Sequence, residues 1–239
     1  MTAPEWDLLR ALDAEDRAQV LASLRRRRYA AGEAVFHDGD TADALHLVAE
    51  GRLLVRRTTE DGDRVAFSVV GPGAAFGELA MLSPQRRRSS TVEALEPCLT
   101  LALSYTDFDR LCVTHPGVTR LLLVLLADRV TRLSDHLVES RHVPVDRRVA
   151  RRLLDLHAVY AAAPAPGNGV ALSVTQADVA DLAGASRSTT NRVLRRLESV
   201  GGLTLSRGRI VIRDVEAVRR VAGLPAVPGP PLPPWARPG

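Results

Sequence analysis

The stretch TQADVADLAGASRSTTNRVLRRL, residues 175–197, holds the side chains in this chain best suited to specific chemistry. It predicts two short helices around a tight turn. Thr175, with Asp178 three residues later, is typical of a capped helix start. Gly184 can adopt the positive φ that a sharp turn between two helices requires. The pattern is therefore typical of a helix-turn-helix, and its alternative is an ordinary helical hairpin with a solvated basic face.

The second helix of this pair has one apolar face and one polar face. Ser186 is its predicted N-cap, and Thr190, Val193, Leu194 and Leu197 recur at core-facing spacing. The outer face carries Arg187, Ser188, Asn191, Arg192 and Arg195. Arginine and asparagine carry the forked donors that match guanine and adenine edges in a major groove.

Charge is distributed along the chain as DNA binding requires. Residues 141–224 contain fourteen arginines against seven acidic residues, whereas residues 1–140 contain seventeen arginines against twenty-one acidic residues. A polyanion would be attracted to the C-terminal third of the chain, and the N-terminal part should have another role.

Length and composition exclude several classes of protein. The 239 residues suffice for about two domains at the usual ~100–200 residues each. No apolar run approaches the ~18 residues of a membrane span, and the N-terminus lacks the pattern of a secretory signal. The two cysteines, Cys98 and Cys112, are too few for a four-cysteine iron–sulfur cluster. Two buried thiols are favoured over one disulfide, and we expect a cytoplasmic protein.

The N-terminal half predicts one helix followed by short strands. Apolar spacing predicts a helix from about Trp6 to Leu24, and the run Arg25–Arg28 is interpreted as its solvated end, the alternative being contact with nucleic acid or an acidic partner. Short apolar segments punctuated by Gly, Asp and Pro then predict an antiparallel sandwich or roll. The predicted strands are 34–36, 45–48, 53–57, 65–70, 92–95 and 99–103.

Residues 117–140 predict a long central helix with an apolar seam. Its residues Leu123, Leu126, Val130, Leu133 and Leu137 step by three and four, which is the spacing of a two-stranded coiled coil. A parallel homodimer is favoured over packing of the seam on the roll. Pro144 disfavours helical geometry at Val143 and ends the helix. Asp146 is then the expected cap of the next helix.

The C-terminal end predicts two further features. Leu203–Leu205 and Arg209–Ile212 predict a small β-hairpin around Arg207-Gly208, as in a wing. From Pro225 onward the chain is rich in Pro and Gly, and we expect it to be disordered.

Over roughly residues 15–222 the chain resembles the CRP/FNR family of bacterial transcription regulators. The resemblance rests on the stretch from Ala31-Gly32-Glu33 through Gly51, on the helix-turn-helix, and on FGELAMLSPQRRRSS at 76–90. The last segment resembles the phosphate-binding cassette of cyclic-nucleotide-binding rolls. Gly77-Glu78-Leu79 is followed, ten residues after Glu78, by Arg88-Ser89.

The chemistry of this cassette suits a cyclic nucleotide. Ionised Glu78 can accept a hydrogen bond from a ribose 2′-hydroxyl, and Arg88 offers a guanidinium fork to two phosphate oxygens. Ser89 and neighbouring backbone amides would complete the anion site. The alternative is a Glu78–Arg88 ion pair that only closes the roll. Arg86 and Arg87 lie beside Arg88, but the spacing and the following serine favour Arg88.

The sequence departs from the family pattern at the residues that recognise the nucleotide base and at one residue that recognises DNA. In the cyclic-AMP-binding member, the base is read by a threonine of the central helix and by the following serine, which comes from the partner subunit. These positions correspond here to Asp135 and His136. Aspartate can accept from the adenine amine, so cAMP is the expected effector; guanine, another nucleotide or no effector stay open. On the DNA-reading helix, Ser188 replaces the family's glutamate and predicts a looser half-site.

The resemblance also implies individual roles at the DNA. Arg187 and Arg192 are predicted to read guanines, and Ser188 and Asn191 complete the base-facing set. The predicted phosphate contacts are Gln176, Ser186, Thr189, Arg195 and Arg207.

Together these observations predict an α+β protein with four segments. They are an antiparallel β-roll of the cyclic-nucleotide-binding type (1–115), a dimerisation helix (116–143), a winged helix-turn-helix (144–224) and a disordered tail (225–239). We expect a non-enzymatic, metal-free homodimer that binds palindromic double-stranded DNA, works with RNA polymerase and does not associate with a membrane. The alternatives are a roll without a nucleotide effector, and a cyclic-nucleotide module that controls a protein partner.

Overall fold

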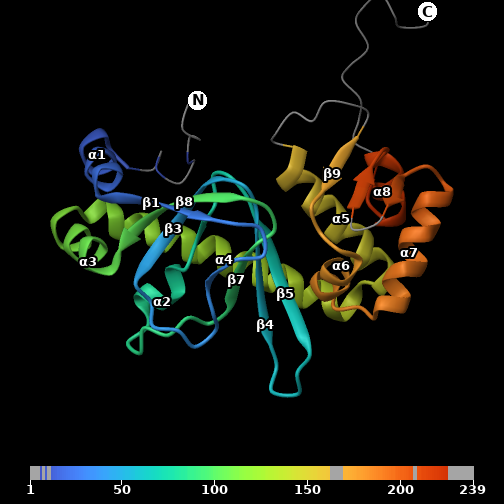
Figure 1. Ribbon diagram of the computed structural model, residues 1–239, viewed down its shortest axis with the longest axis horizontal. Helices are drawn as coiled ribbons and strands as arrows, with labels where there is room; N and C mark the ends of the chain where they lie inside the picture. Colours follow the sequence, from blue (N-terminus) through green and yellow to red (C-terminus); the bar gives the residue numbers. More distant parts are fainter. Residues whose placement is uncertain (1–5, 7–8, 10–11, 162–168, 207–208, 226–239) are drawn as a thin grey trace, which may run out of the picture. The chain divides into compact units, whose positions relative to one another are not determined.

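The structure is a computed structural model that describes residues 6, 9, 12–161, 169–206 and 209–225. The chain divides into two compact units, residues 1–142 and 143–239. We refer to them as the N-terminal unit and the C-terminal unit, and each is described by itself (Figure 1).

The N-terminal unit is a roll of short strands with helices at its ends. Its strands are β1 (Leu24–Tyr29), β2 (Ala34–Phe36), β3 (Ala44–Glu50), β4 (Leu53–Thr58), β5 (Arg64–Val70), β6 (Ala75–Phe76), β7 (Thr91–Ala94) and β8 (Cys98–Ser104). Its helices are α1 (Ala14–Ser23), α2 (Glu78–Leu82), α3 (Tyr105–Thr114) and α4 (Pro116–His142).

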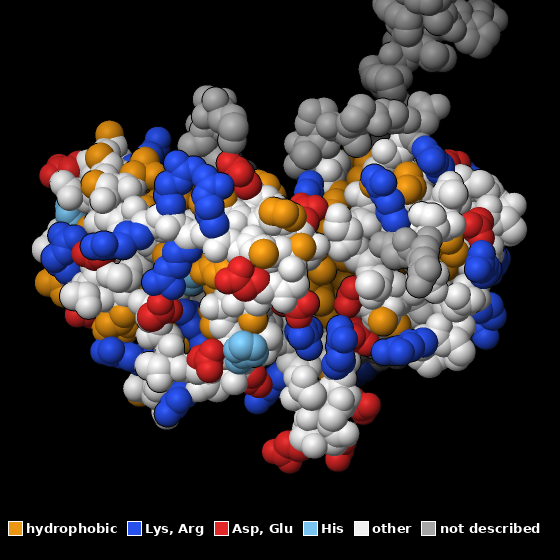
Figure 2. Space-filling model, in the orientation of Figure 1, with side chains coloured by type: hydrophobic (Ala, Val, Ile, Leu, Met, Phe, Trp, Pro, Cys, Tyr) orange, Lys and Arg blue, Asp and Glu red, His pale blue; other side chains and the backbone are white. Residues whose placement is uncertain are grey.

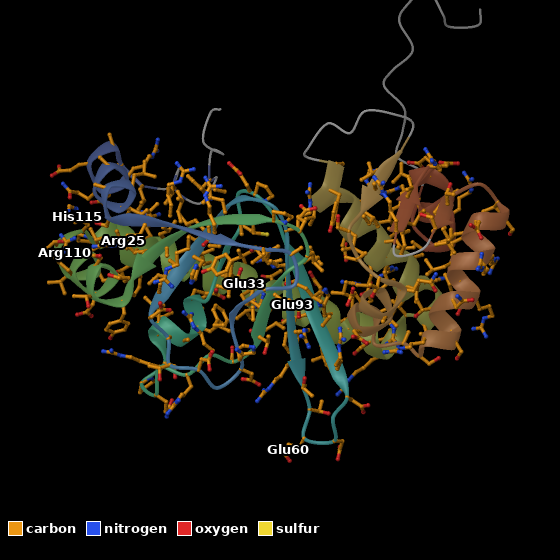
Figure 3. All side chains as sticks on the ribbon, in the orientation of Figure 1. Arg25, Glu33, Glu60, Glu93, Arg110 and His115 are labelled. Carbon is orange, nitrogen blue, oxygen red and sulfur yellow. The ribbon has the colours of Figure 1, made fainter. Side chains whose placement is uncertain are left out.

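Two antiparallel four-stranded sheets form the roll, with strand orders β1-β8-β3-β6 and β2-β7-β4-β5. Alternation along the strands turns apolar side chains inward, where Phe36, Val48, Leu53, Phe76 and Val92 are among the buried residues of one core cluster. Figure 1 shows the β4–β5 hairpin extending beyond the roll. Glu60 lies at its end, and Figure 3 shows this side chain directed away from the body. The predicted antiparallel roll is thus confirmed.

The predicted N-terminal helix is too long. Trp6, Leu9 and Leu12 are buried in a core cluster, but the helix begins only at Ala14. Asp13 is its N-cap, because its extended backbone stops the helix there and its side chain accepts from the amide of Asp16. The apolar spacing therefore reflected burial of this segment and not one continuous helix.

The arginine run is also not a helix end. Arg25–Arg28 lie in β1, an edge strand that pairs antiparallel with β8. The pairing runs without a shift from Leu24 opposite Leu103 to Tyr29 opposite Cys98. All four arginines are exposed. An edge strand tolerates this composition, since charged side chains on an edge discourage further strand pairing. Figure 3 shows Arg25 at the same end of the unit as Arg110 of α3 and as His115.

The long helix α4 changes its surroundings along its length. Val118, Leu121 and Leu122 in its first turns are buried against the roll. Beyond them, apolar side chains are more than half exposed: Leu123, Val124, Val130, Leu133, Leu137 and Val138. Among the described helices none is by itself long and apolar enough for a membrane span; only α3 and α4 pass such a test jointly, and they are bent by 113° at their junction.

The C-terminal unit packs helices against a small sheet. Its helices are α5 (Val145–Ala161), α6 (Gln176–Ala183), α7 (Arg187–Ser199) and α8 (Val215–Val221), and its strands are β9 (Val170–Leu172), β10 (Leu203–Ser206) and β11 (Arg209–Ile212), in the order β10-β11-β9. The predicted helix pair and the predicted hairpin strands are present. β9 and α8 were not predicted.

Helix boundaries in the C-terminal unit follow the capping chemistry with one exception. Thr175 and Asp178 form a full capping box at α6, and Gly184 ends that helix at φ 56°. Ser186 caps α7 by accepting from the amide of Thr189. Asp146, in contrast, is not a cap: α5 begins at Val145, so Asp146 lies within its first turn.

Two further sequence predictions concern the cysteines and the tail. Cys98 and Cys112 are both free thiols, the first buried and the second half-buried. The Pro-rich tail, apart from Pro225, lies outside the described residues.

Candidate functional site

A pocket opens in the N-terminal unit beside α2. The empty space between its walls is about 440 Å³, open solvent at its mouth included. Its walls come from β2, β4–β7, α2, the segment after α2, and α4. The lining residues with polar side chains are Glu78, Arg88, Ser89, Ser90 and Arg129.

Arg88 is the most deeply buried charged residue of this pocket. Its side chain is 1% exposed, and its Cζ lies 4.0 Å from the centroid of the Phe36 ring, a cation–π contact. Nη2 donates to Ala44 O at 2.7 Å and to Asp43 Oδ1 at 3.0 Å, and Nη1 donates to Gly77 O at 3.2 Å. Nε is buried and has no hydrogen-bond acceptor among the described residues. A buried donor without a partner is costly, so this site suits an anionic ligand.

The two neighbouring arginines point elsewhere. Arg86 stacks on the Tyr105 ring with its Cζ 3.4 Å from the centroid. Arg87 is exposed and donates to Gly39 O at 2.9 Å. Of the three consecutive arginines, only Arg88 lines the pocket.

The other cassette residues surround Arg88. Gly77 precedes α2 at φ 87°, and a Cβ there would lie 2.6 Å from Arg88 Nη1. Glu78 is 9% exposed and lines the pocket, and no described residue donates a hydrogen bond to its carboxylate. Leu79 and Ser89 also line the pocket. The arrangement differs from the alternative of a Glu78–Arg88 ion pair, since Arg88 pairs with Asp43.

Helix α4 contributes an unexpected side chain. Arg129 lines the pocket, and its Nε is buried with no hydrogen-bond acceptor in the described part of the chain. Asp135 and His136, the predicted base-reading residues, are exposed further along α4 and do not line the pocket. Sequence reasoning missed Arg129, because nothing in the spacing of α4 separates it from other solvated arginines.

Electrostatics favour a charged Arg88 despite its burial. Burial lowers the pKa of this guanidinium, while the Asp43 carboxylate acts in the opposite direction. Arginine stays protonated under such shifts. The pocket therefore offers a fixed positive charge beside the Glu78 carboxylate.

A second site lies on α7 in the C-terminal unit. Thr190, Val193, Leu194 and Leu197 are buried, as the spacing predicted. The opposite face is exposed, and Figure 2 shows arginine side chains along this edge of the unit. This face carries Ser186, Arg187, Ser188, Asn191, Arg192 and Arg195.

The polar residues of this face differ in how they are held. Asn191 Nδ2 donates to Gln176 Oε1 at 2.9 Å, which links α7 to α6. Arg192 pairs with Asp146 at 3.1 Å and Arg195 with Glu198 at 2.7 Å. Arg187 forms no such pair with the described residues.

The start of α7 and the wing complete this surface. Ser186 Oγ contacts Ser188 Oγ at 2.9 Å and donates to Thr189 Oγ1 at 3.0 Å. Glu198 accepts from the amide of Leu205 at 3.0 Å and so fastens the wing to α7. This bond and the pairing with Arg195 hold the pKa of Glu198 below its usual value. Arg207, at the tip of the predicted wing, lies outside the described residues.

The described residues offer no cluster of three or more His, Cys, Asp or Glu side chains that could ligate a metal ion.

Comparisons with known proteins agree with this geometry. Residues 26–115 match the family model of the cyclic nucleotide-binding domain, and residues 147–221 match that of the Crp-like helix-turn-helix domain. The chain is 32% identical to the cyclic AMP receptor protein of Thermus thermophilus, over 90% of this chain and 96% of that protein. It is 29% identical to the CRP-like cAMP-activated global transcriptional regulator of Mycobacterium tuberculosis, over 80% and 85%.

A solved structure shows the same architecture. The c-di-GMP-responsive global regulator CLP of Xanthomonas campestris superposes with a TM-score of 0.70 at 25% identity, over 84% of this chain and 99% of that one. A cyclic nucleotide-binding roll joined to a helix-turn-helix defines a class of DNA-binding transcription regulators rather than enzymes. The chain belongs to the CRP/FNR family of bacterial transcription regulators.

Proposed function

We propose that this regulator is a cytoplasmic homodimer that binds a palindromic DNA site under the control of a cyclic nucleotide, with cAMP as the effector and RNA polymerase as a partner. The observation that carries the effector proposal is the buried Nε of Arg88, to which no described residue offers an acceptor, in a pocket that also holds Glu78. A cyclic phosphodiester with a free 2′-hydroxyl supplies an acceptor for the first group and a donor for the second.

The relatives support cAMP as the first ligand to test. Both curated relatives described above are named for cyclic AMP, and the solved regulator is named for c-di-GMP. c-di-GMP carries two phosphates, whereas Arg88 is the most fully buried cation of this pocket. Arg129 is a second arginine of this pocket, so c-di-GMP is titrated alongside cAMP.

The homodimer proposal rests on α4. Its seam residues Leu123, Val130, Leu133 and Leu137 are 51–63% exposed, and an apolar heptad seam on a helix is normally buried against a partner helix. A two-fold dimer would present two α7 helices to half-sites one helical turn apart, ~34 Å, on palindromic DNA.

Calorimetry followed by a DNA-binding titration tests the proposal. Full-length protein is titrated with cAMP, cGMP and c-di-GMP, and fluorescence anisotropy then measures its affinity for palindromic and random duplexes with and without nucleotide. We expect cAMP to bind most tightly and to raise affinity for the palindrome more than for the random duplex.

Each alternative predicts a distinct result. DNA binding that is the same with and without every nucleotide would indicate a roll that serves only as a scaffold. Nucleotide binding without salt-sensitive affinity for any duplex would indicate a module acting on a protein partner.

A further inference from the structure

Asp43 immediately precedes β3 and bridges two arginines. Its Oδ1 accepts from Arg88 Nη2 at 3.0 Å and its Oδ2 accepts from Arg27 Nη1 at 2.7 Å. Arg27 belongs to the arginine run of β1, to which the proposed function gives no role. A row Arg27–Asp43–Arg88 therefore connects the edge of one sheet to the pocket.

The row Arg27–Asp43–Arg88 determines which edge of the Arg88 guanidinium is left to bind a ligand. All three acceptors from the protein, Asp43 Oδ1, Ala44 O and Gly77 O, bind Nη1 or Nη2. The Nε–H is buried, yet none of the described residues supplies an acceptor for it. Because a guanidinium is planar and its donors form a rigid fork, anchoring the Nη atoms determines the direction of the Nε edge.

Asp43 is the charged member of this set of acceptors. Partial burial acts to raise its pKa, but the bonds with Arg27 and the charge of Arg88 outweigh burial and hold the pKa below its usual value. The carboxylate is therefore ionised at neutral pH, and charge-assisted bonds of this kind are roughly twice as strong as neutral ones.

We propose that Asp43 is a positioning residue for nucleotide binding: it orients Arg88 so that the Nε edge meets the phosphate, and Arg27 holds Asp43 in turn. This inference rests on the proposed function, because it concerns the same pocket. Asp43 sets the affinity for the phosphate through Arg88 without touching the ligand.

The opposite role makes the opposite prediction. If Asp43 only competed with phosphate for Arg88, then its removal would free the guanidinium and tighten binding. If Asp43 positions Arg88, its removal lets the fork rotate and weakens binding. The sign of the change in affinity separates the two roles.

Calorimetry with cAMP on full-length variants measures that sign. We expect Asp43→Ala to weaken binding at least ~10-fold and Asp43→Asn only ~3-fold, since the amide oxygen still accepts but carries no charge. The matched control is Asp38→Ala. Asp38 is a nearby acid that pairs at 2.9 Å with Arg57, which does not line the pocket, and this variant should bind as the wild type does.

Arg27 has a matched control on the same strand. Arg27→Ala should weaken cAMP binding ~3-fold, whereas Arg26→Ala, which removes the neighbouring exposed arginine, should leave it unchanged. The effects of Arg27→Ala and Asp43→Ala should be non-additive, as expected for residues in one network.

A second measurement distinguishes positioning from general loss of structure. The two phosphorothioate diastereomers of cAMP differ in which exocyclic oxygen is replaced by sulfur. A fork held in one orientation discriminates between them, so Asp43→Ala should bring the ratio of their dissociation constants toward one. Partial unfolding would weaken both and leave the ratio unchanged.

The outcomes are distinguishable. Wild-type affinity or tighter binding in Asp43→Ala and Asp43→Asn, or an unchanged diastereomer ratio, overturns the role of Asp43 and leaves the proposed function standing. If the wild type itself binds no cyclic nucleotide, then the proposed function fails and the role of Asp43 fails with it.

Discussion

The imidazole of His46 stacks on the ring of Phe76, with the ring centroids 5.0 Å apart and the planes inclined by 9°. The two residues face each other across the β3–β6 pair, and His46 Nδ1 lies 3.1 Å from Thr100 Oγ1. Burial lowers the pKa of His46 to about 3. The positive charges of Arg88 and Arg27 also lower this pKa, whereas the Asp43 carboxylate acts to raise it. The histidine is therefore neutral in the folded protein at any ordinary pH.

This histidine should make the N-terminal unit sensitive to mild acid. The unfolded chain binds a proton near pH 6.5 and the folded chain does not, so the contribution to stability is complete above pH 6.5 and is lost as the pH falls toward 3. At ~1.4 kcal/mol per pH unit, the free energy of unfolding should fall by about 2 kcal/mol between pH 7 and pH 5.

Urea denaturation at several pH values checks this prediction. The double variant His46→Phe/Thr100→Val removes the imidazole and its hydroxyl partner together, and it should lose this part of the pH dependence. His142→Gln, at an exposed position, should keep it. An equally steep dependence in the double variant would assign the acid sensitivity to other groups.

Gly77→Ala should abolish much of the nucleotide affinity. Its Cβ would lie 2.6 Å from Arg88 Nη1, and Arg88 cannot move aside without losing its fixed acceptors. Gly73→Ala is the matched control, because Gly73 has φ 91° but nothing within 4 Å of the added Cβ. Both variants carry a backbone strain of about 1–3 kcal/mol.

We expect calorimetry with cAMP to show at least ~10-fold weaker binding for Gly77→Ala and little change for Gly73→Ala. Equal affinities would mean that the close approach of backbone and guanidinium has no part in binding.

Much of the fold could be predicted from the sequence where local signals were strong. The strands between Gly-, Asp- and Pro-rich turns and the two capped helices α6 and α7 are set by their own residues. β1 could not be predicted, because Arg25–Arg28 lack any alternation and become a strand only by pairing with β8. The same holds for β9, three residues long, which pairs with β11.

The residues of the pocket likewise divide into those that the sequence identifies and those that only the folded structure reveals. Gly77, Glu78 and Arg88 lie within one segment, so their spacing identifies them. Other parts of the chain supply Phe36 and Asp43, which contact Arg88, and Arg129, which lines the pocket. No spacing in the sequence connects these three residues to the cassette. Residues that support a site from a distance are visible only once the chain is folded.

A charged residue introduced into the apolar seam of α4 should dissociate the proposed dimer. Leu133 is 51% exposed in the chain, and each apolar side chain buried at such an interface contributes about 1.5–3 kcal/mol. Sedimentation equilibrium should show a dimer for the wild type and a monomer for Leu133→Glu. Val113→Glu is the control, since Val113 is 79% exposed on α3, outside the seam. A dimer that persists in Leu133→Glu would place the interface elsewhere.

Two arginines of α7 should affect DNA binding in different ways. Arg187, which makes no pair with the described residues, is predicted to read a base, so Arg187→Ala should cost about 1–3 kcal/mol at the preferred site and little on random DNA. Arg195→Ala should weaken binding to all sequences alike and reduce the slope of log K against log salt by about 1. Anisotropy titrations on both duplexes across a salt series measure both effects. Uniform loss in Arg187→Ala would make it a phosphate contact.

Thr190→Val should stabilise the C-terminal unit. Thr190 is fully buried in α7, and its Oγ1 has no hydrogen-bond partner within the described ranges of the chain. Valine has nearly the same shape and removes a buried hydroxyl whose desolvation costs about 1–3 kcal/mol. We expect the free energy of unfolding to rise by about 1 kcal/mol.

The reverse change in the same helix is the matched control. Val193 is 2% exposed, and Val193→Thr introduces a hydroxyl into an apolar site, so it should lower stability by about 1–3 kcal/mol. Urea denaturation followed by circular dichroism measures both variants. Because both side chains lie on the buried face of α7, affinity for DNA should stay unchanged in Thr190→Val. A loss of stability in Thr190→Val would show that the hydroxyl has an acceptor in solution, such as a buried water.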